Sequence, residues 1–339
     1  MHPPHRTTIF SRNMQRLSLC LAFAFLSLLN ACAPTAVSTQ GTSRSSVSVW
    51  QPGQIIDGKT GQVLDRSDWL KSLSQYDIVY LGEEHYNRHH IEAALTVLKT
   101  VMAEGIRPVL TMEMFGWDGQ GALNDILSSS DPMDSPWLDR ARWQQNWGGA
   151  YDNYAPLVAF ARDQHLALYA MNPPKSLIRR VVTLRLDQAR QEPEWTLWGM
   201  DREEIVDDPA YRSRILAQLQ RCHGGGAEED YLPMYEASMV RDEGMAKTVA
   251  QALRTARLSE HAPRTLILSY TGGGHIQYHL PVPKRVARRL TEKIAQTTVY
   301  LASYDSSRAD DIVNLVQEGI ADYIWLTPVS QQGLPQRCR

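Results

Sequence analysis

The stretch that decides the fold runs from Tyr76 to His90 and reads YDIVYLGEEHYNRHH. An apolar run over residues 78–81 breaks at Gly82, and acidic residues and histidines follow it before a long helical pattern begins. This order is typical of a buried strand that ends in a polar loop at a helix N-terminus. Ligands of open α/β sheets bind at the carboxyl ends of strands, so this loop is a candidate site.

A second apolar run ends in the same way far downstream. It reads TLILSYTGGGH over residues 265–275. Both strand ends therefore carry the pattern Gly-x-x-His, once from Gly82 to His85 and once from Gly272 to His275. We expect a sheet that brings these two ends together.

Apolar runs and helical patterns alternate along the rest of the chain. The predicted strands are 77–81, 107–115, 166–172, 265–270, 297–304 and 321–328. The main predicted helices are 88–104, 154–164, 232–258 and 284–294. This alternation predicts an α/β fold with a mostly parallel central sheet and helices on both faces.

Three further regions fit this scheme less directly. Residues 50–64 are rich in turn signals and could form a small hairpin. Residues 191–230 are charged, and we expect them to be irregular. Residues 180–260 could form a helical cap.

The composition of the chain limits the classes of function that it can have. The chain has 339 residues, of which 43% are hydrophobic and 21% charged, and its net charge is −2. This is ordinary globular composition. A near-neutral chain lacks the basic footprint of a nucleic-acid-binding protein, so no nucleic acid is expected as a partner.

The N-terminus resembles a secretory signal. Arg12 and Arg16 precede an apolar run over residues 17–29, and this order predicts a signal peptide over residues 1–31. The ending Leu-Asn-Ala-Cys resembles a bacterial lipobox, which would make Cys32 the lipidated first residue of the mature protein. A plain signal peptide without a lipid is the alternative.

The lipobox implies a place in the cell envelope. We expect a lipid-anchored protein on the periplasmic face of the outer membrane or at the cell surface, attached to the membrane through Cys32. Residues 32–50 are rich in serine and threonine and would form a flexible tether. The remaining residues, 51–339, would form the functional domain.

Two cysteines remain beyond the tether. Cys222 and Cys338 could form a disulfide in an oxidising compartment. The alternative is a free Cys222 that, beside His223, binds metal or haem.

Polar side chains gather at four of the predicted strand ends, namely Glu83, Glu84, His85, Glu113, Asn172 and His275. In a parallel sheet all four ends lie on one edge. Carboxylates and imidazoles suit either a metal site with nitrogen and oxygen ligands or a general acid–base pair. A purely structural role, such as capping a helix or pairing with a buried arginine, is the alternative for each residue.

Several motifs together resemble the ChaN-type haem-binding lipoproteins, whose fold is related to the Tiki/TraB and erythromycin-esterase group. They appear in the expected order from about residue 60 to 328: LGEEHYNRHH, TMEMF, WGGAYDNYAPLVAFAR, ALYAMNPP, CHGG, YEASMVRDEGMA, TGGGHIQYHLPVP and DYIWLTP. The resemblance implies a role in haem and iron uptake or storage, with haem-uptake machinery as a partner.

The family's mode of binding is a homodimer that holds two stacked haems, each ligated by a tyrosine of one subunit and contacted by a histidine of the other. Tyrosine is a known axial ligand of haem iron. Tyr278 is the first candidate here, because it lies within the glycine-turn motif, and Tyr154 and Tyr235 are rivals. His279 and His89 complete the residues expected to contact haem.

The wider superfamily implies an alternative function. Its hydrolases use Gly-x-x-His, a glutamate and a second Gly-x-x-His, which correspond to His85, Glu113 and His275. These three residues could hold a divalent metal, with Glu84 as the base for a bound water. We expect a binding protein rather than an enzyme, and a metal-dependent hydrolase of peptides or esters is the second hypothesis.

Overall fold

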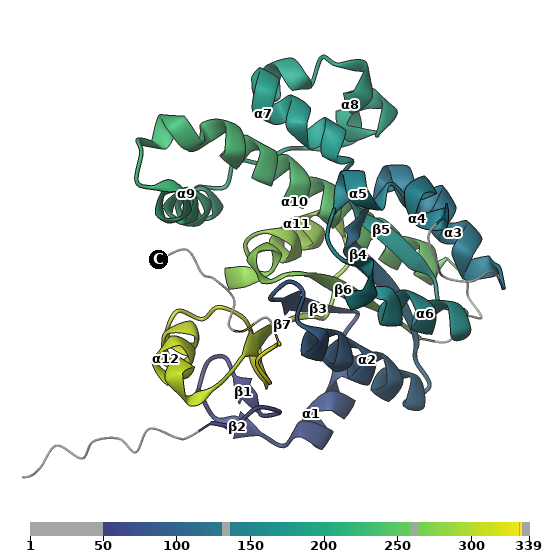
Figure 1. The fold of residues 1–339 in the computed structure, drawn as a ribbon, viewed down its shortest axis with the longest axis vertical. Helices are drawn as coiled ribbons and strands as arrows, with labels where there is room; N and C mark the ends of the chain where they lie inside the picture. Colours follow the sequence, from purple (N-terminus) through teal and green to yellow (C-terminus); the bar gives the residue numbers. More distant parts are fainter. Residues whose placement is uncertain (1–49, 131–135, 259–263, 332, 334–339) are drawn as a thin grey trace, which may run out of the picture. The chain divides into compact units, whose positions relative to one another are not determined.

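The structure, a computed structural model, describes residues 50–130, 136–258, 264–331 and 333. Its centre is an eight-stranded sheet with the order β2-β1-β8-β7-β3-β6-β4-β5 (Figure 1). The strands are β1 (Ile55–Asp57), β2 (Val63–Leu64), β3 (Ile78–Glu83), β4 (Arg107–Gly116), β5 (Leu168–Asn172), β6 (Thr265–Gly272), β7 (Gln296–Ser303) and β8 (Tyr323–Thr327). Every sequence-predicted strand is present.

The sheet is mixed but mostly parallel. The strands from β8 to β5 pair in parallel with their neighbours. The short hairpin of β1 and β2 adds antiparallel to β8. The predicted α/β class and the N-terminal hairpin are therefore confirmed.

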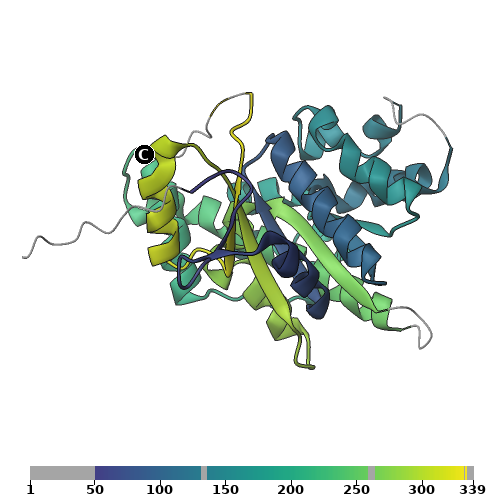
Figure 2. The ribbon, with the colours of Figure 1, turned by 90° about the horizontal axis from the view of Figure 1, so that it is seen from below.

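Helices cover both faces of the sheet (Figures 1 and 2). One face packs against α1 (Arg66–Ser72), α2 (Arg88–Ala103), α3 (Gln120–Ser128), α4 (Pro136–Arg140), α5 (Trp143–Asn146) and α6 (Ala155–Asp163). The other packs against α10 (Glu228–Arg257), α11 (Val282–Arg289) and α12 (Ala309–Gln317). All six residues of β3 are buried, as expected for a parallel strand that is covered on both sides.

A further helical layer lies over the first half of α10. It contains α7 (Lys175–Ala189), α8 (Pro193–Leu197) and α9 (Pro209–His223), which share a separate apolar cluster with α10. This layer occupies the region in which the sequence suggested a helical cap. Among the described residues, no helix is long and apolar enough to cross a membrane.

The prediction that residues 191–230 are irregular was wrong, because α9 lies within them. Only two of its residues, Tyr211 and Leu216, are buried, so its apolar periodicity is faint. Its end signals are clear. The Asp208 side chain accepts hydrogen bonds from the first-turn N–H groups, Pro209 opens the helix, and Gly224 ends it with φ of +93°.

Candidate functional site

The candidate site lies at the carboxyl ends of β3, β4, β5 and β6. A cavity of about 320 Å³ is found there, and the residues that border it include His85, Glu113, Asn172, Lys175, Arg241 and His275. β3 pairs directly with β6, with Glu83 opposite Gly272, so the two Gly-x-x-His ends are neighbours. The expected convergence of His85, Glu113 and His275 at one cavity is therefore present.

Gly272 shows why a glycine is needed at the end of β6. A Cβ atom at this position would lie 2.7 Å from His85 Cε1 and 3.4 Å from Glu113 Oε2. The first distance is shorter than van der Waals contact allows. Because Gly272 has no side chain, the His85 ring can lie over the end of β6, close to the Glu113 carboxylate.

His275 lies between two buried carboxylates. Its Nε2 is 3.2 Å from Glu113 Oε1, and its Nδ1 is 2.5 Å from Asp242 Oδ1. Burial alone would lower the pKa of His275, but the charges of Glu113 and Asp242 raise it to about 10. His275 is therefore an imidazolium at neutral pH.

Both carboxylates also accept hydrogen bonds from groups other than His275. Glu113 Oε2 accepts hydrogen bonds from the Thr271 hydroxyl at 2.7 Å and from the Gly272 N–H at 2.6 Å. Burial opposes ionisation of Glu113, yet His275, His85 and these donors hold its pKa well below the usual range. Asp242 Oδ2 accepts a hydrogen bond from the Tyr211 hydroxyl at 2.6 Å.

His85 forms a second pair with Glu83. Its Nδ1 is 2.8 Å from Glu83 Oε1, and its side chain is 41% exposed, whereas Glu83 is buried. Burial would lower the pKa of His85, but the hydrogen bond that its ring donates to Glu83 and the charge of Glu113 raise it above its ordinary value. Because Nδ1 is engaged by Glu83, Nε2 is the ring nitrogen that remains for the cavity.

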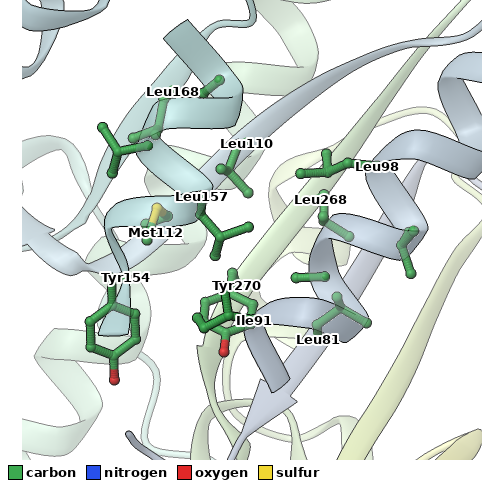
Figure 3. Packing of buried hydrophobic residues seen from close by; sticks show 14 of the residues in the cluster. Leu81, Ile91, Leu98, Leu110, Met112, Tyr154, Leu157, Leu168, Leu268 and Tyr270 are labelled. Atoms are coloured by element: carbon green, nitrogen blue, oxygen red, sulfur yellow. The ribbon is translucent and has the colours of Figure 1, made fainter. Parts of the chain in front are cut away.

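Two buried tyrosines orient Glu83. The hydroxyl of Tyr154 donates to Oε1 at 2.8 Å, and that of Tyr270 donates to Oε2 at 2.6 Å. Both phenol rings lie among the apolar side chains between the sheet and its helices (Figure 3). Burial raises the pKa of Glu83 in spite of these donors.

The expected four-residue metal site is not formed. Over residues 50–130, 136–258 and 264–331, no group of three or more His, Cys, Asp or Glu side chains is arranged to hold a metal ion. Glu84 is turned toward β7, where it accepts hydrogen bonds from the Ser303 N–H at 2.8 Å and from Arg308 at 3.1 Å. It does not border the cavity, so the role of base for a bound water is corrected to a structural one.

Two of the residues expected to contact haem do not border this cavity. Tyr278 and His279 are in the connection between β6 and α11, and His279 Nε2 is 3.4 Å from Asp322 Oδ1. The Tyr278 hydroxyl donates to Glu318, and the Arg214 guanidinium lies 3.9 Å from the ring centroid. Burial and the charge of Glu318 raise the pKa of Tyr278 to about 12.

The other haem candidates are in different surroundings. Tyr154 is fully buried, and its hydroxyl is engaged by Glu83. Tyr235 is 1% exposed and donates to Asp207 at 2.5 Å. His89 is in the first turn of α2, where its Nδ1 is 2.9 Å from Glu92 Oε2, and it borders a separate cavity beside β8.

Three charged residues of the cavity region were not identified from the sequence, namely Lys175, Arg241 and Asp242. The overlooked signal was the run Arg241-Asp242-Glu243 in the middle of a helix whose neighbouring residues are apolar. Asp242 and Glu243 are both buried. Adjacent charges at such a place indicate a polar site, because charged side chains are rarely buried without partners.

Cys222 is near the end of α9 and is disulfide-bonded. Its predicted partner, Cys338, lies outside the described residues, as does the predicted lipidation site Cys32.

Fold and cavity together define an α/β protein with an acid–imidazole pocket at the carboxyl edge of a mostly parallel sheet. The model of one family, described as "Haem-binding uptake, Tiki superfamily, ChaN", matches residues 69–286. The chain belongs to this family, and the resemblance noted in the sequence is confirmed.

One solved structure agrees with this assignment at the level of the fold. ChaN of Campylobacter jejuni, solved with cofacial haem, is similar with a TM-score of 0.58 at 15% identity, over 80% of this chain and 95% of that one. Two further structures are similar with a TM-score of 0.39 each. An erythromycin esterase mutant has 14% identity over 70% of this chain and 72% of that one. The C-terminal region of Pasteurella multocida toxin has 11% identity over 70% of this chain and 25% of that one. No curated protein matches the sequence.

Proposed function

We propose that this protein is a lipid-anchored protein of the bacterial cell envelope that binds haem for uptake or storage, as a haem-bridged homodimer. Membership of a haem-binding family supports the ligand. The similarity to a ChaN structure solved with cofacial haem motivates the dimer. The lipobox at Cys32 and the tether motivate the anchor and a link to haem-uptake machinery at the outer membrane.

The backbone at Tyr278 is the observation that supports this residue as the iron ligand. Tyr278 and His279 both have positive φ, at +57° and +60°, a backbone conformation that residues other than glycine rarely adopt. A hydrogen bond of 2.8 Å from the Tyr278 N–H to the Ile320 carbonyl holds the loop in place. Strain of about 1–3 kcal/mol per residue persists where a function requires it.

Without iron, burial and the charge of Glu318 keep the Tyr278 phenol protonated, because they raise its pKa to about 12. Binding of iron by the phenolate would therefore have to displace this proton. Glu318 accepts the hydrogen bond of the hydroxyl and could take its proton, and Arg214 places a positive charge over the ring. When bound, haem would supply the iron that the phenolate oxygen ligates. His279 lies next to Tyr278 and is 43% exposed, so it is available to a haem propionate.

A haemin titration of the chain from residue 33, with sizing chromatography alongside, tests this function. We expect a saturable ferric spectrum and a shift from monomer to dimer. Tyr278→Phe should weaken binding about tenfold or more, the effect of losing an interaction worth about 1.4 kcal/mol. Tyr169→Phe, on the edge strand β5, is the matched control and should bind haem as the wild type does.

Two outcomes would count against the proposal. A titration without saturation would show that the protein has no specific haem site. Wild-type affinity in Tyr278→Phe would leave haem binding in place and show that another residue ligates the iron.

The second candidate function is a hydrolase of peptides or esters, which the convergence of His85, Glu113 and His275 favours. In a metal-dependent version, a divalent ion would have to displace the proton that Glu113 and Asp242 stabilise on His275. Metal analysis after reconstitution with zinc or manganese tests this version. Stoichiometric metal that is lost in His85→Ala would support it, and protein without bound metal would exclude it.

A further inference from the structure

The cavity contains two cationic side chains that neither of the functions proposed above uses. Arg241 reaches it from α10, and Lys175 reaches it from the first turn of α7. Among the described residues, no carboxylate forms an ion pair with either side chain. The Arg241 Nε is buried and has no hydrogen-bond partner.

A comparison on the same helix shows how Arg241 differs in its ion pairs. Glu243, two residues along from Arg241, forms ion pairs with Arg285, Arg288 and Arg289. The arginines around Glu243 are therefore paired with a buried acid, whereas Arg241 is turned to the cavity. A buried donor without a partner is costly to leave unsatisfied, so this donor is suited to a ligand atom.

The carboxylate closest to the cavity does not neutralise these cations. Glu113 is already paired with His275 at 3.2 Å, and its other oxygen accepts two hydrogen bonds. Asp242 is paired with the other nitrogen of His275. The positive charge of Arg241 and Lys175 therefore remains available in the cavity.

The cavity also has an unsatisfied acceptor. Asn172 donates through Nδ2 to the Glu113 carbonyl at 3.0 Å, while its Oδ1 is buried and without a partner. An oxygen in this state is suited to a hydroxyl or amine of a ligand. The polar groups thus include donors for an anion and an acceptor for a neutral donor group.

Close packing brings Arg241 to this place. A Cβ atom on Gly244 would lie 2.2 Å from Pro173 Cγ, so only glycine lets α10 approach the end of β5 this closely. Arg241 precedes Gly244 by three residues and lies on the same side of the helix. Lys175 begins α7, a helix whose N-terminal end, like other helix N-termini, favours negative charge.

We propose that this cavity binds a small organic anion, whose carboxylate or phosphate group pairs with Arg241 and Lys175 and whose hydroxyl or amine donates to Asn172. A volume of about 320 Å³ is at the small end of known ligand pockets. None of Tyr278, His279 and His89 borders the cavity, so the anion site is separate from the proposed haem site. The proposal goes beyond haem binding and does not depend on it.

Isothermal titration of the haem-free mature chain with two probes, inorganic phosphate and malate, tests the site. We expect saturable binding of at least one probe, and the preferred probe tells phosphate from carboxylate chemistry. Arg241→Gln and, separately, Lys175→Gln should each weaken binding about tenfold, the usual effect of losing a charge-assisted hydrogen bond. Arg179→Gln, on the exposed side of α7, is the matched control and should bind as the wild type does.

The haem titration separates this proposal from the one above. Arg241→Gln should bind haemin with wild-type affinity, and Tyr278→Phe should bind the anion with wild-type affinity. Absence of saturable binding for both probes, or wild-type anion affinity in both Arg241→Gln and Lys175→Gln, would overturn the anion site. Displacement of the bound anion by haemin would overturn its separation from the haem site.

Discussion

Two neighbouring parts of the connection between β6 and α11 differ in how their side chains are held. On the cavity side, His275 is clamped between Glu113 and Asp242, and each carboxylate has a further donor behind it. On the other side, Tyr278 and His279 are partly exposed, have positive φ, and each has a single carboxylate as partner. Residues only three positions apart therefore belong to a rigid buried network and to a strained surface loop.

This difference has a physical consequence for ligands. The network around His275 has its hydrogen bonds satisfied and keeps its geometry without a ligand, so this part of the cavity is preorganised. A strained loop with few partners can change conformation at little cost, which suits a ligand that must be bound and released. The following predictions test the contrast.

The largest effect is expected when the buried network loses a charge. Glu113→Gln leaves the His275 imidazolium with one carboxylate instead of two. Breaking a buried ion pair typically costs about 3–5 kcal/mol, so we expect the free energy of unfolding in urea to fall by about this much. Glu104→Gln, at the exposed C-terminal end of α2, is the control and should change it by less than about 0.5 kcal/mol. A similarly small change in Glu113→Gln would contradict the rigid network.

A second effect is expected from pH. The pKa of His275 is raised to about 10, above its value of about 6.5 in the unfolded chain. The stabilisation is therefore complete below about pH 6.5 and is lost as the pH rises toward 10. In metal-free protein, this group should lower the free energy of unfolding by on the order of 3 kcal/mol between pH 7 and 10.

Urea unfolding at several pH values measures this loss against His275→Gln. The variant lacks the titrating group, so its stability should fall less steeply over the same range. Parallel curves for the two proteins would show that His275 is not held as an imidazolium.

The smallest effect is expected in the strained loop. His279→Gly removes a side chain from a residue at φ of +60°, a region in which glycine is not strained. It also removes the weak contact with Asp322. We expect a gain in unfolding free energy of about 0.5–1 kcal/mol in thermal or urea unfolding. Destabilisation by more than about 1 kcal/mol would show that the loop is held by its contacts rather than strained.

Much of the architecture could be read from local patterns. The apolar run at residues 78–81, the glycine after it and the helical spacing from residue 88 are local features, and they place a polar loop at a strand end. Two such ends with Gly-x-x-His were enough to predict that His85 and His275 meet, because parallel strands end on the same edge of a sheet.

Other elements were missed where the local signal was weak or misleading. α9 buries too few side chains to show a clear periodicity, and its cap residues were the better guide. The helix predicted over residues 232–258 begins earlier in the structure, because α10 starts at Glu228 and contains Pro233.

The sequence by itself determined the alternation of strands and helices, the two polar strand ends and the membership of a haem-binding family, because these depend on local periodicity and short motifs. Only the tertiary structure decided which side chains pair with one another. It turned Glu84 to Arg308, 224 residues away, and it brought Asp242 and Arg241 from α10 to the cavity. Such pairings depend on which faces of distant elements pack together, and local spacing carries no information about them.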